Sequence, residues 1–279
     1  MKILRSIFSV QKYIKQVRGK NKTIGFVPTM GALHQGHLKL VKEARRENAI
    51  VIVSIFVNPV QFGPSEDFKK YPRQIKQDSL LLDDEKVDVV FYPTVEMVYP
   101  RGYLTYVNVE SVSEGLCGAY RPGHFKGVAT VVAKLLNIIM PDAIYLGQKD
   151  GQQVAVLKRM VNDLNFPVKV KVVKTVREKD GLAMSSRNRY LNDEERQQAP
   201  VLWQALRSAQ DMIRSGEYNS GKVVTAIMTH ITEKSSAKVQ YVCIVDKNTL
   251  EPLKECRKDA MIAVAVYFGS TRLIDNIII

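Results

Sequence analysis

The sequence predicts an α/β fold, in which a Rossmann-like, doubly wound parallel sheet is followed by a smaller α+β domain. Three observations lead to this prediction. Strand and helix patterns alternate through the first half of the chain, and the strands are apolar along their whole length, as strands buried on both faces are. After Val176 the pattern changes to a loop of small and basic residues, then helices and late strands. We therefore divide the chain into domains 1–176 and 177–279.

The first elements form a strand-helix-strand unit. Residues 23–29 (TIGFVPT) predict a buried strand, and residues 37–48 place their apolar side chains on one face of a helix. Residues 49–57 (AIVIVSIFV) predict the next strand. This order is typical of parallel strands joined by a crossover helix.

The alternation continues to the domain boundary. Residues 87–93 and 142–147 predict strands, and apolar residues recur at helical spacing over 127–139 and 154–164. Residues 167–176 (PVKVKVVKTV) predict the strand that closes the series.

The second domain is smaller. Asn192, with Glu195 three residues later, predicts a helix capping box. Two helical stretches follow, and residues 238–245 and 260–268 predict strands.

Composition indicates a globular cytoplasmic protein. The chain has 279 residues of which 46% are hydrophobic, enough for a substantial core. No apolar run approaches the about 20 residues that a membrane span needs, and charges interrupt the N-terminal stretch, which excludes a secretory signal. The 3 cysteines form no C-x-x-C pair and predict reduced thiols. We expect no membrane partner.

The net charge of +13 is compatible with nucleic acid, a membrane surface or phosphorylated small molecules as partners. The lysines are spread along the chain, with no basic tail and no basic motif interleaved with aromatic residues. This distribution favours a positive solvated surface over a nucleic-acid platform, so we expect no nucleic-acid partner.

Unusual turns follow three of the predicted strands, after Thr29, Val57 and Gly147. Ligands bind at the carboxyl ends of strands in an open parallel sheet, so these turns should face one crevice. In the first turn, TMGALHQGH, Gly31 and Gly36 permit close backbone approach and a helix begins, which suits a phosphate group.

The histidines of this turn, His34 and His37, have two interpretations. At helical spacing they can face the same side and donate to a phosphoryl oxygen. They can equally be structural, or bind zinc, for which only His124 and His230 remain as further histidine ligands. The pair alone leaves function and structure open.

Longer motifs connect the chain with a known family. H-x-G-H after a strand is similar to the signature of the nucleotidyltransferase superfamily. The segments VPTMGALHQGH, SIFVNPVQFGPSEDFKKYPR, GAYRPGHFKGVATVVAKLLNI, YLGQKDGQQ and AMSSRNRYL span most of the chain. In this order they resemble the pantothenate synthetase family of pantoate:β-alanine ligases.

The resemblance implies site residues as well as an activity. The catalytic residues would be His34, His37, Lys149 and Arg187. The ATP-binding residues would be Met30, Gly31, Ala32, Leu33, His34, Gln35, Gly36, His37, Gly147, Gln148, Lys149, Asp150, Val176, Met184, Ser185, Ser186 and Arg187. Many members of the family have Glu at the position of Gln148, and we expect this departure to cost no activity.

Substrate and metal contacts follow from the same resemblance. Gln61, Gln153 and Asn58 would contact substrate, and without the resemblance Gln61 would be interpreted as a loop cap. Magnesium is expected near an acidic residue of DFKKYPRQIKQD, for which we choose Asp78.

Two further loops keep alternative interpretations. Arg121 and His124 of RPGHF either line the pantoate pocket or stabilise their loop. MSSR, residues 184–187, resembles the KMSKS-type element and would make the second domain a lid over ATP, but it also fits a plain hairpin loop after Asp180 and Gly181.

The implied reaction condenses (R)-pantoate with β-alanine to pantothenate at the expense of ATP, with Mg²⁺, through a pantoyl adenylate. The resemblance also implies a homodimer. One alternative is another H-x-G-H nucleotidyltransferase, which would need a phosphate-accepting pocket in place of Gln61 and Gln153. The other is an RNA-interacting relative of the aminoacyl-tRNA synthetases. The roughly 100 residues after the domain boundary leave little room for the anticodon-reading module that such a protein would need.

Overall fold

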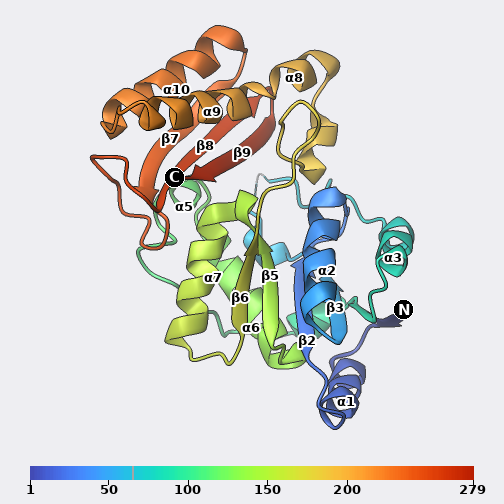
Figure 1. The fold of residues 1–279 in the computed structure, drawn as a ribbon. Helices are drawn as coiled ribbons and strands as arrows, with labels where there is room; N and C mark the ends of the chain where they lie inside the picture. The colour runs from blue at the N-terminus through green and yellow to red at the C-terminus, as the bar shows by residue number, and fades with distance from the viewer. Residues whose placement is uncertain (65) are drawn as a thin grey trace. The chain divides into compact units, whose positions relative to one another are not determined.

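The computed structural model describes residues 1–64 and 66–279 (Figure 1). The chain packs into two units. Unit 1 comprises residues 1–114, 118–147 and 156–173, and unit 2 comprises residues 115–117, 148–155 and 174–279. The turn at 148–150 and the first residues of the following helix therefore pack with unit 2, whereas the sequence-based boundary at residue 176 assigns them to the first domain.

Unit 1 is built on a six-stranded sheet in the order β1-β4-β3-β2-β5-β6 (Figure 1). All neighbouring strands are parallel, which confirms the doubly wound fold class. The strand order reverses between β2 and β5, so the switch point where such sheets bind ligands lies at the end of β2. The strands are β1 (Lys2–Leu4), β2 (Ile24–Thr29), β3 (Ile50–Ile55), β4 (Val89–Phe91), β5 (Ala143–Gly147) and β6 (Lys169–Val173).

Helices connect these strands. α2 packs on β2, β3 and β5, whereas α1 and α6 contact each other. The elements are α1 (Ile7–Arg18), α2 (Gln35–Glu47), the 3₁₀ helix η1 (Pro59–Gln61), α3 (Ile75–Asp84), α4 (Val95–Val98) and α6 (His124–Ile139). Two more helices have residues in both units, α5 (Cys117–Tyr120) and α7 (Gly151–Asp163).

The central strands are buried on both faces. Val51 and Val53 belong to the apolar cluster that includes Val41 and Ala44 of α2. Ile52, which points to the other face of the sheet, has no exposed surface either. Strands covered on both sides must be apolar at every position, which is why their sequences read as continuous apolar runs.

Unit 2 has an antiparallel sheet in the order β7-β8-β9 (Figure 1). Apolar residues of its helices and strands form one core, among them Leu206, Ile227 and Val264. The sequence predicted two of these strands, β7 and β8, whereas β9 was not predicted. The elements are the 3₁₀ helices η2 (Gln148–Asp150) and η3 (Ser186–Tyr190), α8 (Asp193–Gln198), α9 (Val201–Arg214), α10 (Ser220–Lys234), β7 (Lys238–Asp246), β8 (Ala260–Phe268) and β9 (Thr271–Ile278).

The capping box at Asn192 is confirmed. Its side chain accepts from the Glu195 amide at 2.9 Å, and the Glu195 carboxylate accepts from the Asn192 amide at 3.0 Å. Among the described residues, no helix combines the length and the apolar character that crossing a membrane requires.

Candidate active site

The loop after β2 is held in one conformation by its own backbone and by a buried carboxylate. Gly31 has φ +82°, and a Cβ there would lie 2.9 Å from Oδ2 of Asp78, so glycine fits both the backbone and the space. The Asp78 carboxylate, on α3, accepts from the amide of Ala32 at 3.0 Å and of Leu33 at 2.9 Å. This pairing explains how Ala32 keeps a left-handed φ of +52°.

Asp78 does not fit the magnesium site that we predicted. Its side chain is 1% exposed, and each of its carboxylate oxygens already accepts a backbone amide. Magnesium retains several waters in protein sites and needs an accessible carboxylate. Over residues 1–64 and 66–279, no group of three or more His, Cys, Asp or Glu side chains could hold a metal ion. The role that the structure supports for Asp78 is to shape the 30–33 loop.

The two histidines of the loop lie against each other at the start of α2. Their ring centroids are 4.1 Å apart. His34 is the N-cap, and its Nδ1 accepts from the Gly36 amide at 3.1 Å, while Nδ1 of His37 accepts from the His34 amide at 3.3 Å. The expectation that the rings share one side is confirmed. An imidazole that accepts at Nδ1 carries its proton on Nε2 when neutral, so both rings have Nε2–H as a donor group.

This capping arrangement joins the two interpretations that the sequence left open. The rings satisfy backbone amides of the helix start, which is a structural task, and the same bonds orient their Nε2–H groups. The positive end of the α2 dipole lies at the same place, so the local field favours an anion. α2 begins at Gln35, earlier than the predicted 37, because His34 rather than a later residue caps it.

Gln61 ends η1 and is 9% exposed. Its Nε2 donates to the sulfur of Met30 at 2.9 Å, and its Oε1 accepts from Nδ2 of Asn58 at 3.1 Å. A thioether is a weak acceptor, so a substrate oxygen would be a better partner for this N–H group. The structure thus brings two predicted site residues, Met30 and Gln61, into contact.

Asn58 has a fully used amide group. Nδ2 donates to Gln61 and to the carbonyl of Gly127, both at 3.1 Å. Oδ1 accepts from the amide of Val60 at 3.3 Å and from the hydroxyl of Tyr99 at 2.9 Å. Burial raises the pKa of Tyr99 above its ordinary value, which keeps this hydroxyl protonated. The geometry favours a supporting role for Asn58 over the direct substrate contact that we predicted.

Arg121 and His124 lie beside the same loop. Nδ1 of His124 is 2.7 Å from the backbone carbonyl oxygen of Gln61, and Nε2 is 3.1 Å from a guanidinium nitrogen of Arg121. Arg121 also binds Glu66 through two hydrogen bonds of 2.6 Å. Burial alone would raise the pKa of Glu66, but the Arg121 guanidinium holds the pKa of this carboxyl below its ordinary value.

A cavity of about 250 Å³ lies at the carboxyl ends of β2, β3 and β4. Two arginines at this cavity stack on aromatic rings, Arg5 on Tyr92 at 5.0 Å and Arg73 on Phe68 at 5.1 Å. Three of the residues that line it belong to the predicted site, namely Met30, Gly31 and Asp78.

In unit 2, the turn that carries Lys149 is held by the last strand. The side-chain Nδ2 of Asn276 on β9 donates to the backbone carbonyls of Gln148 and Lys149, both at 2.9 Å. In return Nε2 of Gln148 donates to Oδ1 of Asn276 at 2.8 Å. The ammonium of Lys149 lies 3.9 Å from Asp150, a separation at which an ion pair adds little stability.

A buried ion pair lies next to this turn. Asp275 is 3% exposed and accepts from both terminal nitrogens of Arg177, at 2.5 and 3.1 Å. Burial raises the pKa of Asp275 above its ordinary value, against the opposing effect of Arg177. The Arg177 guanidinium also stacks on Trp203 at 3.6 Å.

The MSSR segment follows a tight hairpin, as the alternative interpretation expected. The Met184 amide donates to the carbonyl of Val176 at 3.0 Å, which places two predicted ATP-binding residues side by side. Ser185 caps η3 by accepting from the Arg187 amide at 3.2 Å. The side chain of Asn188 ties this helix to Glu178 at 2.9 Å.

Gln153 lies in the first turn of α7 and is half-buried. Its neighbour Gln152 is buried and binds the backbone of Cys117 at 2.9 Å and of Gly115 at 2.8 Å. Gln152 therefore has a structural role within unit 2.

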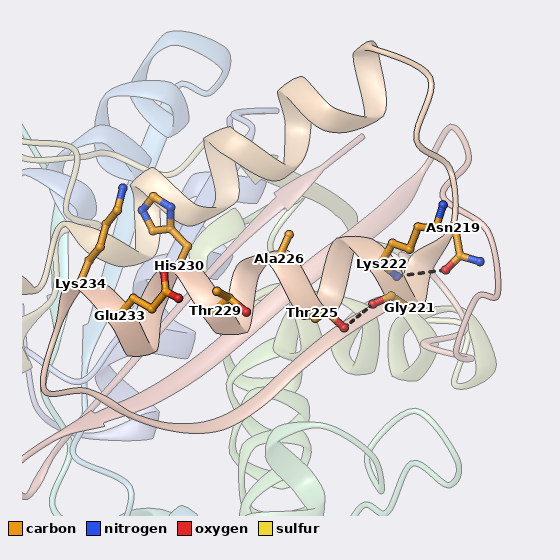
Figure 2. A pocket seen from close by; sticks show the side chains of 9 residues that line it. All are labelled: Asn219, Gly221, Lys222, Thr225, Ala226, Thr229, His230, Glu233 and Lys234. Carbon is orange, nitrogen blue, oxygen red and sulfur yellow. Dashed lines mark hydrogen bonds between the residues drawn. The ribbon is translucent and has the colours of Figure 1, made fainter.

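A shallow hollow lies on the exposed side of α10, and none of the residues that line it belongs to the predicted site (Figure 2). Burial and then the charge of Lys234 lower the pKa of His230, so this histidine is neutral near pH 7. The lining residues are Asn219, Gly221, Lys222, Thr225, Ala226, Thr229, His230, Glu233 and Lys234.

The sequence pointed to Asp78 in a different role, as a metal ligand, and gave no indication of the other residues that hold these groups in place. Asp78, Tyr99 and Glu66 support the 30–33 loop and Gln61, and Asn276 supports the Lys149 turn. Each acts across a long sequence separation, and no local pattern distinguishes it from an ordinary polar residue.

Comparison with known proteins places the chain in a family. The sequence model of the pantoate-beta-alanine ligase family matches residues 2–278. Pantothenate synthetase of Thermotoga petrophila is 51% identical over 279 residues, 100% of both chains. That of Moorella thermoacetica is also 51% identical, over 100% of this chain and 99% of the relative.

Solved structures that are similar to this chain come from the same family. Pantothenate synthetase from Thermus thermophilus superimposes with a TM-score of 0.95 at 45% identity and covers 99% of each chain. Pantoate-beta-alanine ligase from Francisella tularensis, solved with beta-gamma ATP and beta-alanine, gives a TM-score of 0.78 at 37% identity, over 100% of this chain and 97% of that one. With a family match along nearly its whole length, this chain belongs to the pantoate-beta-alanine ligases.

Proposed function

We propose that the chain condenses (R)-pantoate with β-alanine to give pantothenate, with ATP converted to AMP and pyrophosphate. The observation that carries this proposal is the family match over residues 2–278, which includes the oriented histidine pair and Gln61. The Francisella relative was solved with beta-gamma ATP and beta-alanine, which supports ATP and β-alanine as substrates here.

In the first half-reaction, a carboxylate oxygen of pantoate attacks the α-phosphorus of ATP. The bond from this phosphorus to the bridging oxygen breaks, pyrophosphate leaves, and pantoyl adenylate forms. The carboxylate is already ionised at neutral pH, so the step needs no general base. The protein must align the reactants and stabilise charge on the phosphoryl oxygens.

His34 and His37 fit this task. Both present Nε2–H donors at the start of α2, where the helix dipole already favours an anion. Because their Nδ1 atoms are occupied by backbone amides, the donors are oriented before substrate arrives. We propose His37 as the principal catalytic residue and His34 as its companion, with the loop 30–37 around the phosphates.

The ATP-binding residues from Gly147 onward have complementary roles in the proposal. Lys149 supplies a positive point charge, and Arg187 a planar fork for two oxygens. Ser185 and Ser186 supply hydroxyl donors, while Gly147 to Asp150 and Val176 with Met184 bind the nucleotide. In this proposal residues 1–176 bind ATP and pantoate, and residues 177–279 act as a lid that carries the MSSR loop.

For the other substrates, we propose that Gln61 donates from Nε2 to an oxygen of pantoate and also contacts β-alanine, and that Gln153 contacts pantoate. In the second half-reaction, the neutral amine of β-alanine attacks the acyl carbon. The bond from the acyl carbon to the AMP oxygen breaks, an amide forms, and the nitrogen loses a proton.

Magnesium enters the proposal as part of the MgATP substrate. Asp78 is 1% exposed and each of its oxygens accepts a backbone amide, so no step is assigned to a metal held by this residue. We also propose a cytoplasmic homodimer, as the family resemblance implies. Size-exclusion chromatography with light scattering should then give about twice the monomer mass.

A coupled assay of AMP formation tests the proposed activity. With ATP, pantoate and β-alanine all present, AMP should accumulate steadily. Without β-alanine no AMP should be released, since the AMP moiety stays in the bound adenylate, and only pyrophosphate should form, to about one equivalent of enzyme. Without pantoate neither product should form. AMP formation that does not depend on pantoate would refute the proposal.

A further inference from the structure

A side chain from the start of α6 forms a hydrogen bond with the backbone of Gln61. Nδ1 of His124 lies 2.7 Å from the carbonyl oxygen of Gln61. A terminal nitrogen of Arg121 lies 3.4 Å from the same oxygen, at the long limit of a hydrogen bond. Of these two side chains, His124 therefore makes the closer contact with the Gln61 backbone.

The two neighbours of His124 determine which nitrogen carries its proton. A carbonyl oxygen can only accept, so Nδ1 must donate to Gln61. A guanidinium can only donate, so Nε2, at 3.1 Å from Arg121, must accept. His124 is thus a neutral imidazole with its proton on Nδ1, the opposite tautomer to His34 and His37.

Arg121 is itself fixed in orientation. Two hydrogen bonds of 2.6 Å join it to both carboxylate oxygens of Glu66, and the two side chains are 14% and 23% exposed. A bidentate pair of this kind defines the plane of the guanidinium. Glu66 thus orients Arg121, Arg121 orients the His124 ring, and the His124 ring orients the Gln61 backbone.

The side chain of Gln61 is oriented by a separate set of bonds. Because the carbonyl of Gly127 accepts from Nδ2 of Asn58, the orientation of the Asn58 amide is unambiguous. The Gln61 atom that meets Nδ2 of Asn58 must then be Oε1, which leaves Nε2 to face Met30. With backbone and side chain both fixed, Gln61 presents an N–H donor in one direction only.

We infer that His124, oriented by Arg121 and Glu66, is a positioning residue that aims the Nε2–H donor of Gln61 at an oxygen of the bound hydroxy acid. This inference rests on the proposed contact between Gln61 and pantoate. His124 acts through the Gln61 backbone and touches no reacting atom. The arrangement selects a substrate that offers an oxygen acceptor, and it discriminates against an analogue that offers only a donor there.

Two substitutions separate the two ends of the His124 ring. In His124→Asn, the amide nitrogen takes the place of Nδ1 and still donates to Gln61. In His124→Gln, the amide reaches the place of Nε2, so it still meets Arg121 but leaves the Gln61 carbonyl without its donor. We expect KM for pantoate to rise about tenfold in His124→Gln, as the loss of one ordinary hydrogen bond gives. His124→Asn should stay within about threefold, and KM for ATP should change little in either variant.

A double-mutant cycle with Gln61→Ala decides whether His124 acts through Gln61. Gln61→Ala removes the aimed donor, so His124→Gln should then cost no further increase in KM for pantoate. If the two effects instead multiply, His124 does not act through Gln61 and the inference is wrong. Equal losses in His124→Asn and His124→Gln, with equal drops in melting temperature, would also overturn it.

The cycle also separates this inference from the function on which it depends. If Gln61→Ala alone leaves KM for pantoate unchanged, the proposed substrate contact fails and the inference fails with it. If Gln61→Ala raises KM but the cycle shows no coupling, only the role of His124 is lost. Arg121→Lys serves as a second probe, because a lysine cannot replace the bidentate bond to Glu66, and it should raise KM in the same direction as His124→Gln.

Discussion

Replacement of Asp78 by asparagine should destabilise the protein through the loop that follows β2. In the wild type, two backbone amides donate to a charged carboxylate that is 1% exposed. Asparagine has the same shape but only one acceptor oxygen, so its NH₂ group would face the amide of Ala32 or of Leu33. The substitution tests the loop-shaping role against the metal-binding role that the sequence suggested.

The magnitude follows from these two bonds. A hydrogen bond to a charged acceptor contributes about 1.5–3 kcal/mol, a neutral one about 1 kcal/mol, and a buried donor without an acceptor costs about 1–3 kcal/mol. Loss of two charged bonds and gain of one neutral bond lowers the free energy of unfolding by about 2–5 kcal/mol, and the unsatisfied donor adds to this loss. Since whole proteins have about 5–15 kcal/mol, this loss is readily measured.

Urea unfolding of Asp78→Asn gives the free energy directly, and a magnesium titration of the activity tests the alternative. Asp84→Asn is the matched control, because Asp84 is exposed on the same helix and its replacement should change stability by less than about 0.5 kcal/mol. The reasoning is wrong if Asp78→Asn unfolds like the wild type but needs more magnesium for activity. That result would return Asp78 to the metal site.

Three more predictions follow from the contacts described above. In Gly127→Ala, the new Cβ would lie 2.6 Å from the carbonyl oxygen of Val60, so stability should fall by about 1–3 kcal/mol in urea unfolding despite the better helix propensity of alanine. Gly221→Ala, which meets only a side-chain oxygen at 3.2 Å, is the control, and equal stabilities of the two variants would contradict the close approach of α6 to η1. Gln148→Glu should raise KM for ATP severalfold, because the new carboxylate would place an oxygen against Oδ1 of Asn276 where Nε2 of Gln148 now donates. An unchanged KM would show that the Lys149 turn does not depend on the contact between residues 148 and 276. The pKa of Glu66 is lowered from 4.5 in the folded protein, so the stability it contributes is present above that pH and is lost as the pH falls through the folded pKa. The difference in unfolding free energy between wild type and Glu66→Gln should therefore shrink below pH 4.5, and a difference that stays constant there would exclude the ion pair as its source.

The fold was largely predictable because its central strands are covered on both faces. Residues 50–55 are apolar at nearly every position, and such a run in strand-helix-strand order leaves few alternatives. β9 escaped prediction for the converse reason. Asp275 and Asn276 interrupt its apolar pattern, and both are buried because each has a specific polar partner. β1 has only 3 residues, too few to show a period.

The residues of the site were predictable from the sequence, but the hydrogen bonds that hold them in place were not. The H-x-G-H motif identifies His34 and His37, yet their capping of α2 was not foreseen, because capping patterns are usually recognised by Ser, Thr, Asp and Glu. Three of the partners of Gln61 come from positions 30, 121 and 124, which only the fold brings to it. Polar pairs across such separations leave no trace in local spacing.

The central claim is that the oriented imidazoles and Lys149 stabilise charge during adenylate formation. Pantoate-dependent exchange of labelled pyrophosphate into ATP measures this step alone. His37→Asn is the sharpest variant, since its side-chain oxygen can still accept from the His34 amide and keep the helix cap, while the Nε2–H donor is lost. We expect exchange to fall about 10²- to 10³-fold in His37→Asn and similarly in Lys149→Ala, with unfolding free energies close to wild type. Near-wild-type exchange in both variants would contradict the account.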